Sequence, residues 1–270
     1  MTTQDRGLAA LGLDGVPALY PLTYPGLPVT EPSLLTGTEL LPLLARPGGV
    51  GAWSVDGAAP ALDDVLAGLG QAPVAGRHAV IAVGSNASPG QVSHKLTRLG
   101  LLGAVPMVPV RLRGIGVGCS AHIGRAGYVA AAPYPAPAAR SSLVVSWLDA
   151  AQLAAVDATE LPHYRRVRLP GAAYAMTLPS GEPLDHAYVY VGARGVLADP
   201  ATGLPRPGGG DQAALLDALL GASPALFELL GPDPAAWVRR AAADAALRAR
   251  GTRVFADEGW VLPWTELPAV

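Results

Sequence analysis

A short apolar run that ends at a glycine constrains the fold of this chain more than any other feature. His78-Ala-Val-Ile-Ala-Val83 carries no charged residue after its histidine and is followed at once by Gly84-Ser85-Asn86. A continuous apolar run of this length, bounded by a turn signal, is typical of a strand buried on both faces. We therefore predict a buried strand that turns directly into a helix, which we place at Ser93–Leu102.

The turn Gly84-Ser85-Asn86 is a candidate site for an anionic group. Backbone N–H groups at a helix start have no intrahelical acceptor and carry partial positive charge. Glycine allows a ligand to approach the backbone closely, and Ser85 and Asn86 add side-chain hydrogen bonds. A tight connection in which Ser or Asn caps the helix explains the same residues equally well. From these residues alone, both interpretations stay open.

Glu160 is a candidate proton acceptor. Leu153, Val156 and Glu160 are spaced so that they share one face of a predicted helix. If the two apolar side chains face the core, the carboxylate lies at the end of a buried stripe. A partly desolvated carboxylate accepts a proton more readily near neutral pH than a solvated one. A solvated glutamate that has left the helical register is the alternative.

Pro, Gly and apolar patterning divide the chain into three parts. Residues 1–77 are interrupted by Pro and Gly but retain apolar residues, so we expect an extended arm that packs on the core. Short helices are expected there near Glu39–Leu44 and Asp63–Leu69. Residues 78–204 form the predicted strand-rich core, and residues 205–270 a helical C-terminal extension.

Within the core, the last of the further strands has a nearly continuous apolar pattern and is predicted to be central. These strands are expected at Met107–Gly118, Tyr128–Ala132, Ser142–Trp147, Tyr164–Leu169 and His186–Val191. A helix is predicted over Asp149–Thr159, with Gln152 three residues after the Asp149 cap, as in a capping box.

In the C-terminal extension, three helix starts carry a cap residue, and two of them add a proline at the first helical position. They are Asp211, for a helix through Leu220, Ser223-Pro224, and Asp233-Pro234, for a helix that stops before Gly251. A final strand-like segment is expected at Thr252–Trp264.

Two of these motifs together resemble a known family. Val83-Gly84-Ser85-Asn86 is similar to the Tyr-Gly-Ser-Asn signature of the gamma-glutamylcyclotransferase family, and Val156-Asp157-Ala-Thr-Glu160 to its later Leu-Asp-x-x-Glu motif. The 74 residues from Asn86 to Glu160 are similar to the family's spacing. The resemblance covers about residues 78–195 and leaves both ends of the chain outside it.

The resemblance implies an α+β fold: a mixed β-barrel with flanking helices that needs no metal or organic cofactor. It implies that Glu160 is the general base for the substrate's α-amino group. The freed amine would attack the γ-carbonyl to give 5-oxoproline and release an amine or amino acid. Val83, Gly84, Ser85 and Asn86 would form the loop that holds the γ-glutamyl group. Tyr164, just beyond Glu160, is expected to line the same pocket.

Two other functions remain open. Val83 stands where the family usually has Tyr, and Leu161 where it usually has Gly. These differences are compatible with a non-catalytic binding or scaffold protein that has kept the pocket. The segment from Ile81 to Pro89 also resembles the opening of dihydropterin pyrophosphokinases. Those enzymes hold magnesium with an Asp-x-Asp pair, and this sequence contains none, so we rank that function third.

Composition narrows the partners. The formal net charge is −2. A protein that binds nucleic acid is expected to carry a basic face, and the charge of this chain gives no indication of one. No window approaches the ~18 apolar residues of a membrane span, and the N-terminus lacks a signal-peptide pattern. We therefore expect a cytoplasmic protein with a small-molecule substrate and no membrane partner. The five histidines show no metal-ligand spacing. Cys119 is expected to be a buried structural residue, and Lys95 is the only lysine.

Overall fold

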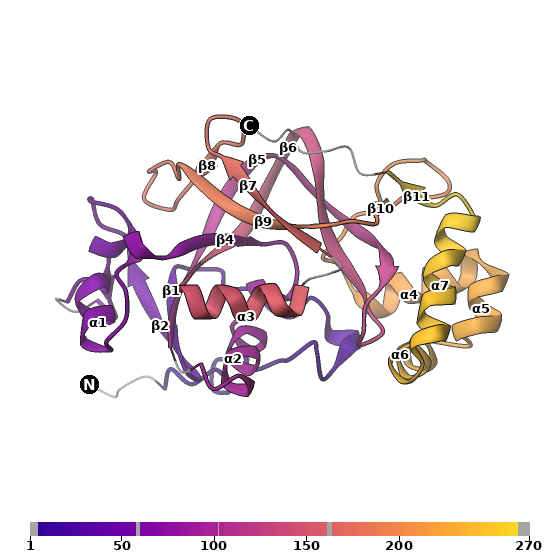
Figure 1. Cartoon of the computed structure of the whole chain (residues 1–270), viewed down its shortest axis with the longest axis horizontal. Helices are drawn as coiled ribbons and strands as arrows, with labels where there is room; N and C mark the ends of the chain where they lie inside the picture. Colours follow the sequence, from indigo (N-terminus) through magenta and orange to yellow (C-terminus); the bar gives the residue numbers. More distant parts are fainter. Residues whose placement is uncertain (1–4, 58–59, 102, 161–163, 264–270) are drawn as a thin grey trace.

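The computed structural model describes residues 5–57, 60–101, 103–160 and 164–263. They form a mixed α+β fold built on a sheet of eleven strands (Figure 1). The strands are β1 (Ser33–Thr36), β2 (Glu39–Leu44), β3 (Ser54–Val55), β4 (His78–Ala82), β5 (Ala104–Ile123), β6 (Val129–Leu148), β7 (Tyr164–Pro170), β8 (Met176–Thr177), β9 (His186–Gly192), β10 (Val196–Leu197) and β11 (Val261–Leu262).

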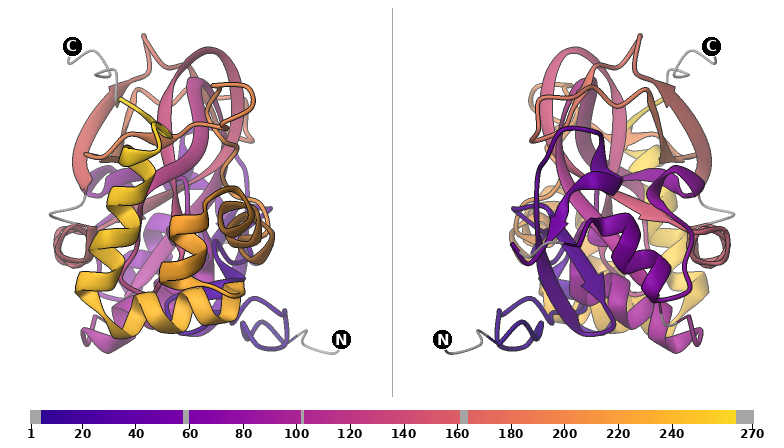
Figure 2. Two further views of the ribbon diagram at one scale, coloured as in Figure 1. Left: turned by 90° about the vertical axis from the view of Figure 1, so that its right-hand side faces the viewer. Right: turned by 90° about the vertical axis from the view of Figure 1, so that its left-hand side faces the viewer.

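The described residues also form seven α-helices, which lie around this sheet. They are α1 (Leu62–Gly68), α2 (Pro89–Arg98), α3 (Ala150–Glu160), α4 (Gln212–Ala222), α5 (Pro224–Leu230), α6 (Pro234–Ala243) and α7 (Ala245–Asp257). Helices α4 to α7 gather at one end of the molecule, and the N-terminal strands with α1 lie at the opposite end (Figure 2). Among the described residues no single helix is long and apolar enough to cross a membrane; α4 and α5 pass that test only as a pair bent by 120°.

The apolar run that begins at His78 forms β4, and this strand lies inside the sheet. It pairs antiparallel with β6 on one side and parallel with β9 on the other. The main path of the sheet is β3-β2-β1-β5-β6-β4-β9-β7. Strand β9 also has a partner on each side, so its predicted central position is confirmed. No pairing between described residues joins β7 to β3, so the sheet is open and the expected closed barrel is not confirmed.

Strands β5 and β6 are longer than predicted. Three separate segments were expected where the structure has two strands of 20 residues each. The prolines of β6 fall at alternate positions (Pro133, Pro135 and Pro137). Because successive N–H groups of a strand point to opposite sides, alternate prolines remove donors from one edge only. The pairing of β6 with β5 therefore continues at Pro133 and Pro135, which lie opposite Val117 and Ile115. Beyond Pro135 the register shifts, and it resumes where Arg113 lies opposite Arg140.

The N-terminal region contributes strands to the same sheet. The helix expected at Glu39–Leu44 is wrong: this segment is β2, which pairs antiparallel with β1, with Ser33 opposite Pro42. Strand β1 in turn pairs with β5. A proline inside the segment disfavours a helix, and the short connection between β1 and β2 favours a hairpin instead. The division of the chain into an arm, a core and an extension stays a prediction.

The helices that carry the candidate residues start near the predicted positions. Helix α2 begins at Pro89, four residues before the predicted start, because a proline suits the first helical position; the predicted end, Leu102, lies outside the described residues. The capping box of α3 is confirmed: Asp149 Oδ1 accepts from the Gln152 N–H at 2.8 Å, and the Gln152 amide oxygen accepts from the Asp149 N–H at 3.0 Å.

In the C-terminal part, the caps of α4, α5 and α6 are confirmed. The helix expected to run from Asp233 toward Gly251 is instead two helices, because Asp244 caps α7 by accepting from the backbone of Ala246 and Leu247. Gly251 lies inside α7, close to the Ile123 side chain. The prediction of a strand over Thr252–Trp264 is therefore wrong for its first half, which belongs to α7. Within the described part of this segment, β11 is the strand, and Trp264 lies outside the described residues.

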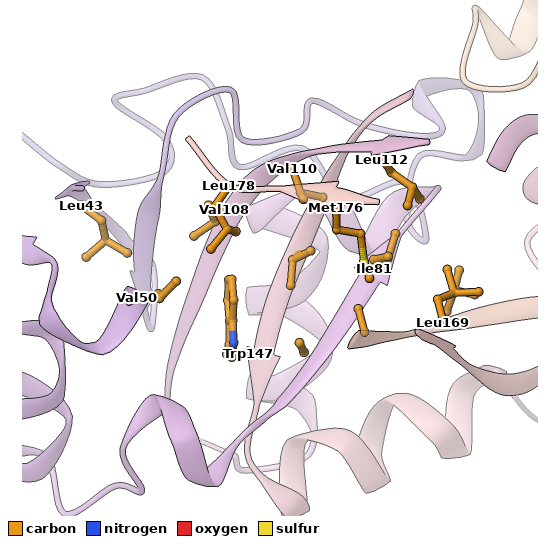
Figure 3. Packing of buried hydrophobic residues seen from close by; sticks show 14 of the residues in the cluster. Leu43, Val50, Ile81, Val108, Val110, Leu112, Trp147, Leu169, Met176 and Leu178 are labelled. Atoms are coloured by element: carbon orange, nitrogen blue, oxygen red, sulfur yellow. The ribbon is translucent and has the colours of Figure 1, made fainter. Parts of the chain in front are cut away.

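The sheet has a hydrophobic cluster on each face. One surrounds Trp147 and Ile81, together with Val108, Val110 and Leu169 (Figure 3). The other joins the sheet to α2 and α3 through Val92 and Leu96 of α2 and Leu153 and Val156 of α3. As predicted, Leu153 and Val156 are buried. Both helices are thereby held on the same side of β4 and β6.

We expect Asp149→Ala to lower the free energy of unfolding by about 1 kcal/mol, because it removes the N-cap acceptor of α3. Asp217→Ala is the matched control: Asp217 is exposed within α4, so its stability should stay within about 0.5 kcal/mol of wild type. Urea unfolding measures both. Equal stability of Asp149→Ala and wild type would contradict the cap.

Candidate functional site

The chain leaves β4 through Val83 and Gly84, and residues Ser85–Ala87 then form a single 3₁₀ turn, η4, that leads into α2. The backbone of Gly84 has φ −134° and ψ −140°. A glycine is needed here for space, because a Cβ at this position would collide with the hydroxyl of Tyr24. The predicted strand-to-helix turn is therefore built against a buried aromatic side chain from the N-terminal region.

Glu160 is the last residue of α3, and its carboxylate faces this turn. Its Oε1 accepts a hydrogen bond from Asn86 Nδ2 at 3.0 Å and lies 3.4 Å from Lys95 Nζ. The side chain of Glu160 is 20% exposed, so it sits at the end of the buried face of α3 and retains some access to solvent. The structure thus brings together two predicted residues that are 74 positions apart.

A cavity of about 770 Å³ opens between the turn and the end of α3. All six residues singled out from the sequence line it: Val83, Gly84, Ser85, Asn86, Glu160 and Tyr164. The volume lies within the range of small-molecule sites. This position favours a binding site over a turn that serves only to connect a strand to a helix.

Tyrosines form one wall of the cavity, including three that the sequence analysis did not select. Tyr24, Tyr128 and Tyr190 line it together with Tyr164. The rings of Tyr24 and Tyr128 stack with centroids 4.3 Å apart. The Ala131 N–H donates to the Tyr24 hydroxyl at 2.8 Å. No motif links these tyrosines, so only the fold could reveal them.

The tyrosine hydroxyls stay protonated at neutral pH. Burial raises the pKa of Tyr128 to about 12; the nearby charge of Glu160 adds to the rise, and a hydrogen bond with Ser85 opposes it. Burial, followed by the charge of Glu160, also raises the pKa of Tyr164, while a hydrogen bond with Ser120 lowers it. The wall therefore offers neutral hydroxyl groups beside the carboxylate.

Lys95 is the second group that the sequence analysis did not select as functional. It lies on α2, and its side chain is only 11% exposed. Its Nζ donates to Asn86 Oδ1 at 2.9 Å and to Thr159 Oγ1 at 2.8 Å, besides its contact with Glu160. The available signal was composition: this is the only lysine among 19 lysine and arginine residues.

The charge in the cavity is unbalanced. Among the described residues that line it, Glu160 is the only carboxylate, whereas Lys95, Arg98 and Arg125 are cationic. A cavity with excess positive charge attracts ligands with anionic groups. No group of three or more His, Cys, Asp or Glu side chains suited to a metal ion occurs in the described part of the chain.

The segment Cys119-Ser120-Ala-His122 contributes to the site through its histidine. His122 lines the cavity, and its Nδ1 lies 2.6 Å from the hydroxyl of Ser120. Cys119 is buried, which raises the pKa of its thiol to about 11. Its Sγ lies 3.2 Å from the carbonyl oxygen of Pro207. This agrees with the structural role expected of Cys119.

No model of a known protein family matches the chain, and no curated protein matches its sequence. Solved structures similar to it include two solution structures of Arabidopsis thaliana proteins. One is 19% identical and has a TM-score of 0.32. The match covers 43% of this chain and 61% of that protein, which is less than two thirds of its length. The other is 16% identical, with coverage of 58% and 95% and a TM-score of 0.35. A gamma-glutamyl cyclotransferase is 11% identical, with coverage of 72% and 92% and a TM-score of 0.34.

We expect Gly84→Ala to lower the free energy of unfolding by about 1–3 kcal/mol, because the new methyl group meets a ring that stacking and a hydrogen bond hold in place. Adding Tyr24→Phe, which removes the hydroxyl, should recover part of the loss. Gly221→Ala is the control, since a Cβ there meets open space; it should be neutral or stabilising by up to about 1 kcal/mol. Urea unfolding that finds Gly84→Ala as stable as Gly221→Ala would refute the close approach.

The raised pKa of Tyr128 predicts a loss of stability in alkali. Its ordinary pKa is 10.0 and its folded value about 12, so the unfolded chain releases the proton first and stability falls as pH rises from 10 to 12. Tyr128→Phe should make this fall shallower. Tyr20→Phe, at a side chain that is 65% exposed, should leave it unchanged. Urea unfolding at several pH values compares the slopes; equal slopes for Tyr128→Phe and wild type would count against the burial argument.

Proposed function

We propose that this protein is a gamma-glutamylcyclotransferase-like enzyme that forms 5-oxoproline from a γ-glutamyl amine or amino acid. One observation carries the proposal. The carboxylate of Glu160 lies within hydrogen-bond distance of Asn86, at a cavity that the turn Gly84-Ser85-Asn86 also lines. These are the two motifs whose resemblance to that family the sequence shows.

The cavity suits a γ-glutamyl group. Backbone N–H groups at the start of η4 have no intrahelical acceptor and can bind the carboxylate of the substrate. The cationic side chains of the cavity favour the same anionic group. The tyrosine wall supplies apolar surface and neutral hydroxyl donors, a combination typical of small-molecule sites.

The reaction needs one group that moves a proton. Glu160 accepts a proton from the α-amine as its nitrogen attacks the γ-carbonyl carbon and the new C–N bond closes the five-membered ring. The C–N bond to the leaving amine then breaks, and the proton passes from Glu160 to that amine. No water is consumed and no oxidant is required, so the residues of the cavity suffice for the chemistry.

The contact between Glu160 and Asn86 also bears on the alternative function. A binding protein that has lost the chemistry would not need a carboxylate that contacts this turn at the cavity. Val83 lines the cavity where the family usually has Tyr, so one aromatic side chain is missing at this position. Four tyrosines from other parts of the chain supply an aromatic wall in its place.

We expect Glu160→Gln to reduce kcat for 5-oxoproline release by about 10²–10⁴-fold, because it removes the base at nearly constant shape. Glu228→Gln on the exposed surface of α5 is the control and should retain the wild-type rate. The assay follows 5-oxoproline from a panel of γ-glutamyl amines and γ-glutamyl amino acids. Equal rates for wild type and Glu160→Gln, or no product with any substrate, would reject the proposal.

A further inference from the structure

The three donors of Lys95 face three acceptors. An ammonium group has three N–H bonds and no acceptor, and Nζ lies near Asn86 Oδ1, Thr159 Oγ1 and Glu160 Oε1. The Thr159 hydroxyl donates its own proton to the Val156 carbonyl at 2.8 Å. It can therefore only accept from Lys95. The side chain of Lys95, from the last turn of α2, thus places its ammonium between the η4 turn and the end of α3.

This arrangement settles which way the amide of Asn86 points. The side-chain atom that faces a lysine must be an acceptor, so it is Oδ1. The NH₂ group then has to face Glu160, where Nδ2 lies 3.0 Å from Oε1. Without the ammonium, the amide could turn so that its oxygen faces the carboxylate, which would place two acceptors together.

The same contacts distinguish the two oxygens of Glu160. Oε1 takes the hydrogen bond from Asn86 and the contact with Lys95. Within the described part of the chain, the hydrogen bonds to this carboxylate all fall on Oε1. An oxygen that already receives two donors is a poorer proton acceptor than its neighbour, because its lone pairs are engaged.

We infer that Lys95 is a positioning residue for the reaction: it fixes the Asn86 amide and Oε1 of Glu160, so that Oε2 is the oxygen that accepts the proton of the attacking amine. The choice of Oε2 rests on the proposed function. The orientation of Asn86 does not, because it follows from the donors and acceptors alone.

The experiment exploits the fact that the chain has a single lysine and a single, buried cysteine. In Lys95→Cys, 2-bromoethylamine alkylates the introduced thiol, with loss of bromide, and rebuilds a side chain of lysine length that ends in an ammonium. 2-Bromoethanol gives a side chain of the same length that ends in a neutral hydroxyl. The two forms differ only at the terminal group, and treated wild type controls for reaction at Cys119.

Two measurements are made on each form. Steady-state kinetics of 5-oxoproline release gives kcat and KM separately. Proton NMR of the ¹⁵N-labelled protein gives the solvent-exchange rate of the Asn86 side-chain amide. The amide measurement does not require activity. A purely structural role of Lys95 would change stability but leave kcat and the amide exchange rate the same in the two alkylated forms.

We expect the hydroxyl form to lose about 10²-fold in kcat, the scale of a small misplacement of a catalytic group, with KM within about threefold of wild type. Its Asn86 amide should exchange faster with solvent. The ammonium form should recover most of both properties. Equal kcat and equal amide exchange in the two forms would overturn the inference. If wild type forms no 5-oxoproline, the proposed function and the role of Oε2 fail, and amide exchange alone decides whether Lys95 positions Asn86.

Discussion

The packing of α2 and α3 on one face of the sheet is the constraint on which the rest of the site depends. Apolar side chains from both helices are buried against β4, β6 and their neighbours. This burial brings α2, with the η4 turn before it, close to the end of α3, although these segments are far apart in sequence. The polar contacts of Asn86, Lys95 and Glu160 then form where the two helices meet. Hydrophobic burial provides the stability, and the polar contacts determine the geometry of the site.

The N-terminal region also lines the cavity, through Ala18 and Tyr24. Tyr24 stacks on Tyr128, accepts a hydrogen bond from Ala131, and leaves room for only a glycine at position 84. The tight turn after β4 and the aromatic wall are therefore one structural unit. Changes in residues 1–77 are expected to reach the site through this side chain.

Local signals predicted the parts of the structure that local interactions determine. The buried strand β4 follows from its apolar run, and the start of α3 from Asp149 and Gln152. The strand at Glu39–Leu44 was missed although its partner β1 precedes it closely in the sequence. The pairings that join this hairpin to the sheet, β1 with β5 and β2 with β3, involve residues more distant in the sequence. Glu160 could be selected from its helical spacing. Lys95 could not, because its role arises only when the ends of two helices come together.

The most direct test of the central claim is the fate of water in the reaction. Purified protein is incubated with a γ-glutamyl amino acid in H₂¹⁸O, and the products are identified by mass spectrometry. Intramolecular attack by the α-amine predicts 5-oxoproline without ¹⁸O, together with the free amino acid. Glutamate that carries ¹⁸O would reveal hydrolysis instead, and it would contradict a site in which Glu160 acts on the substrate's own amine.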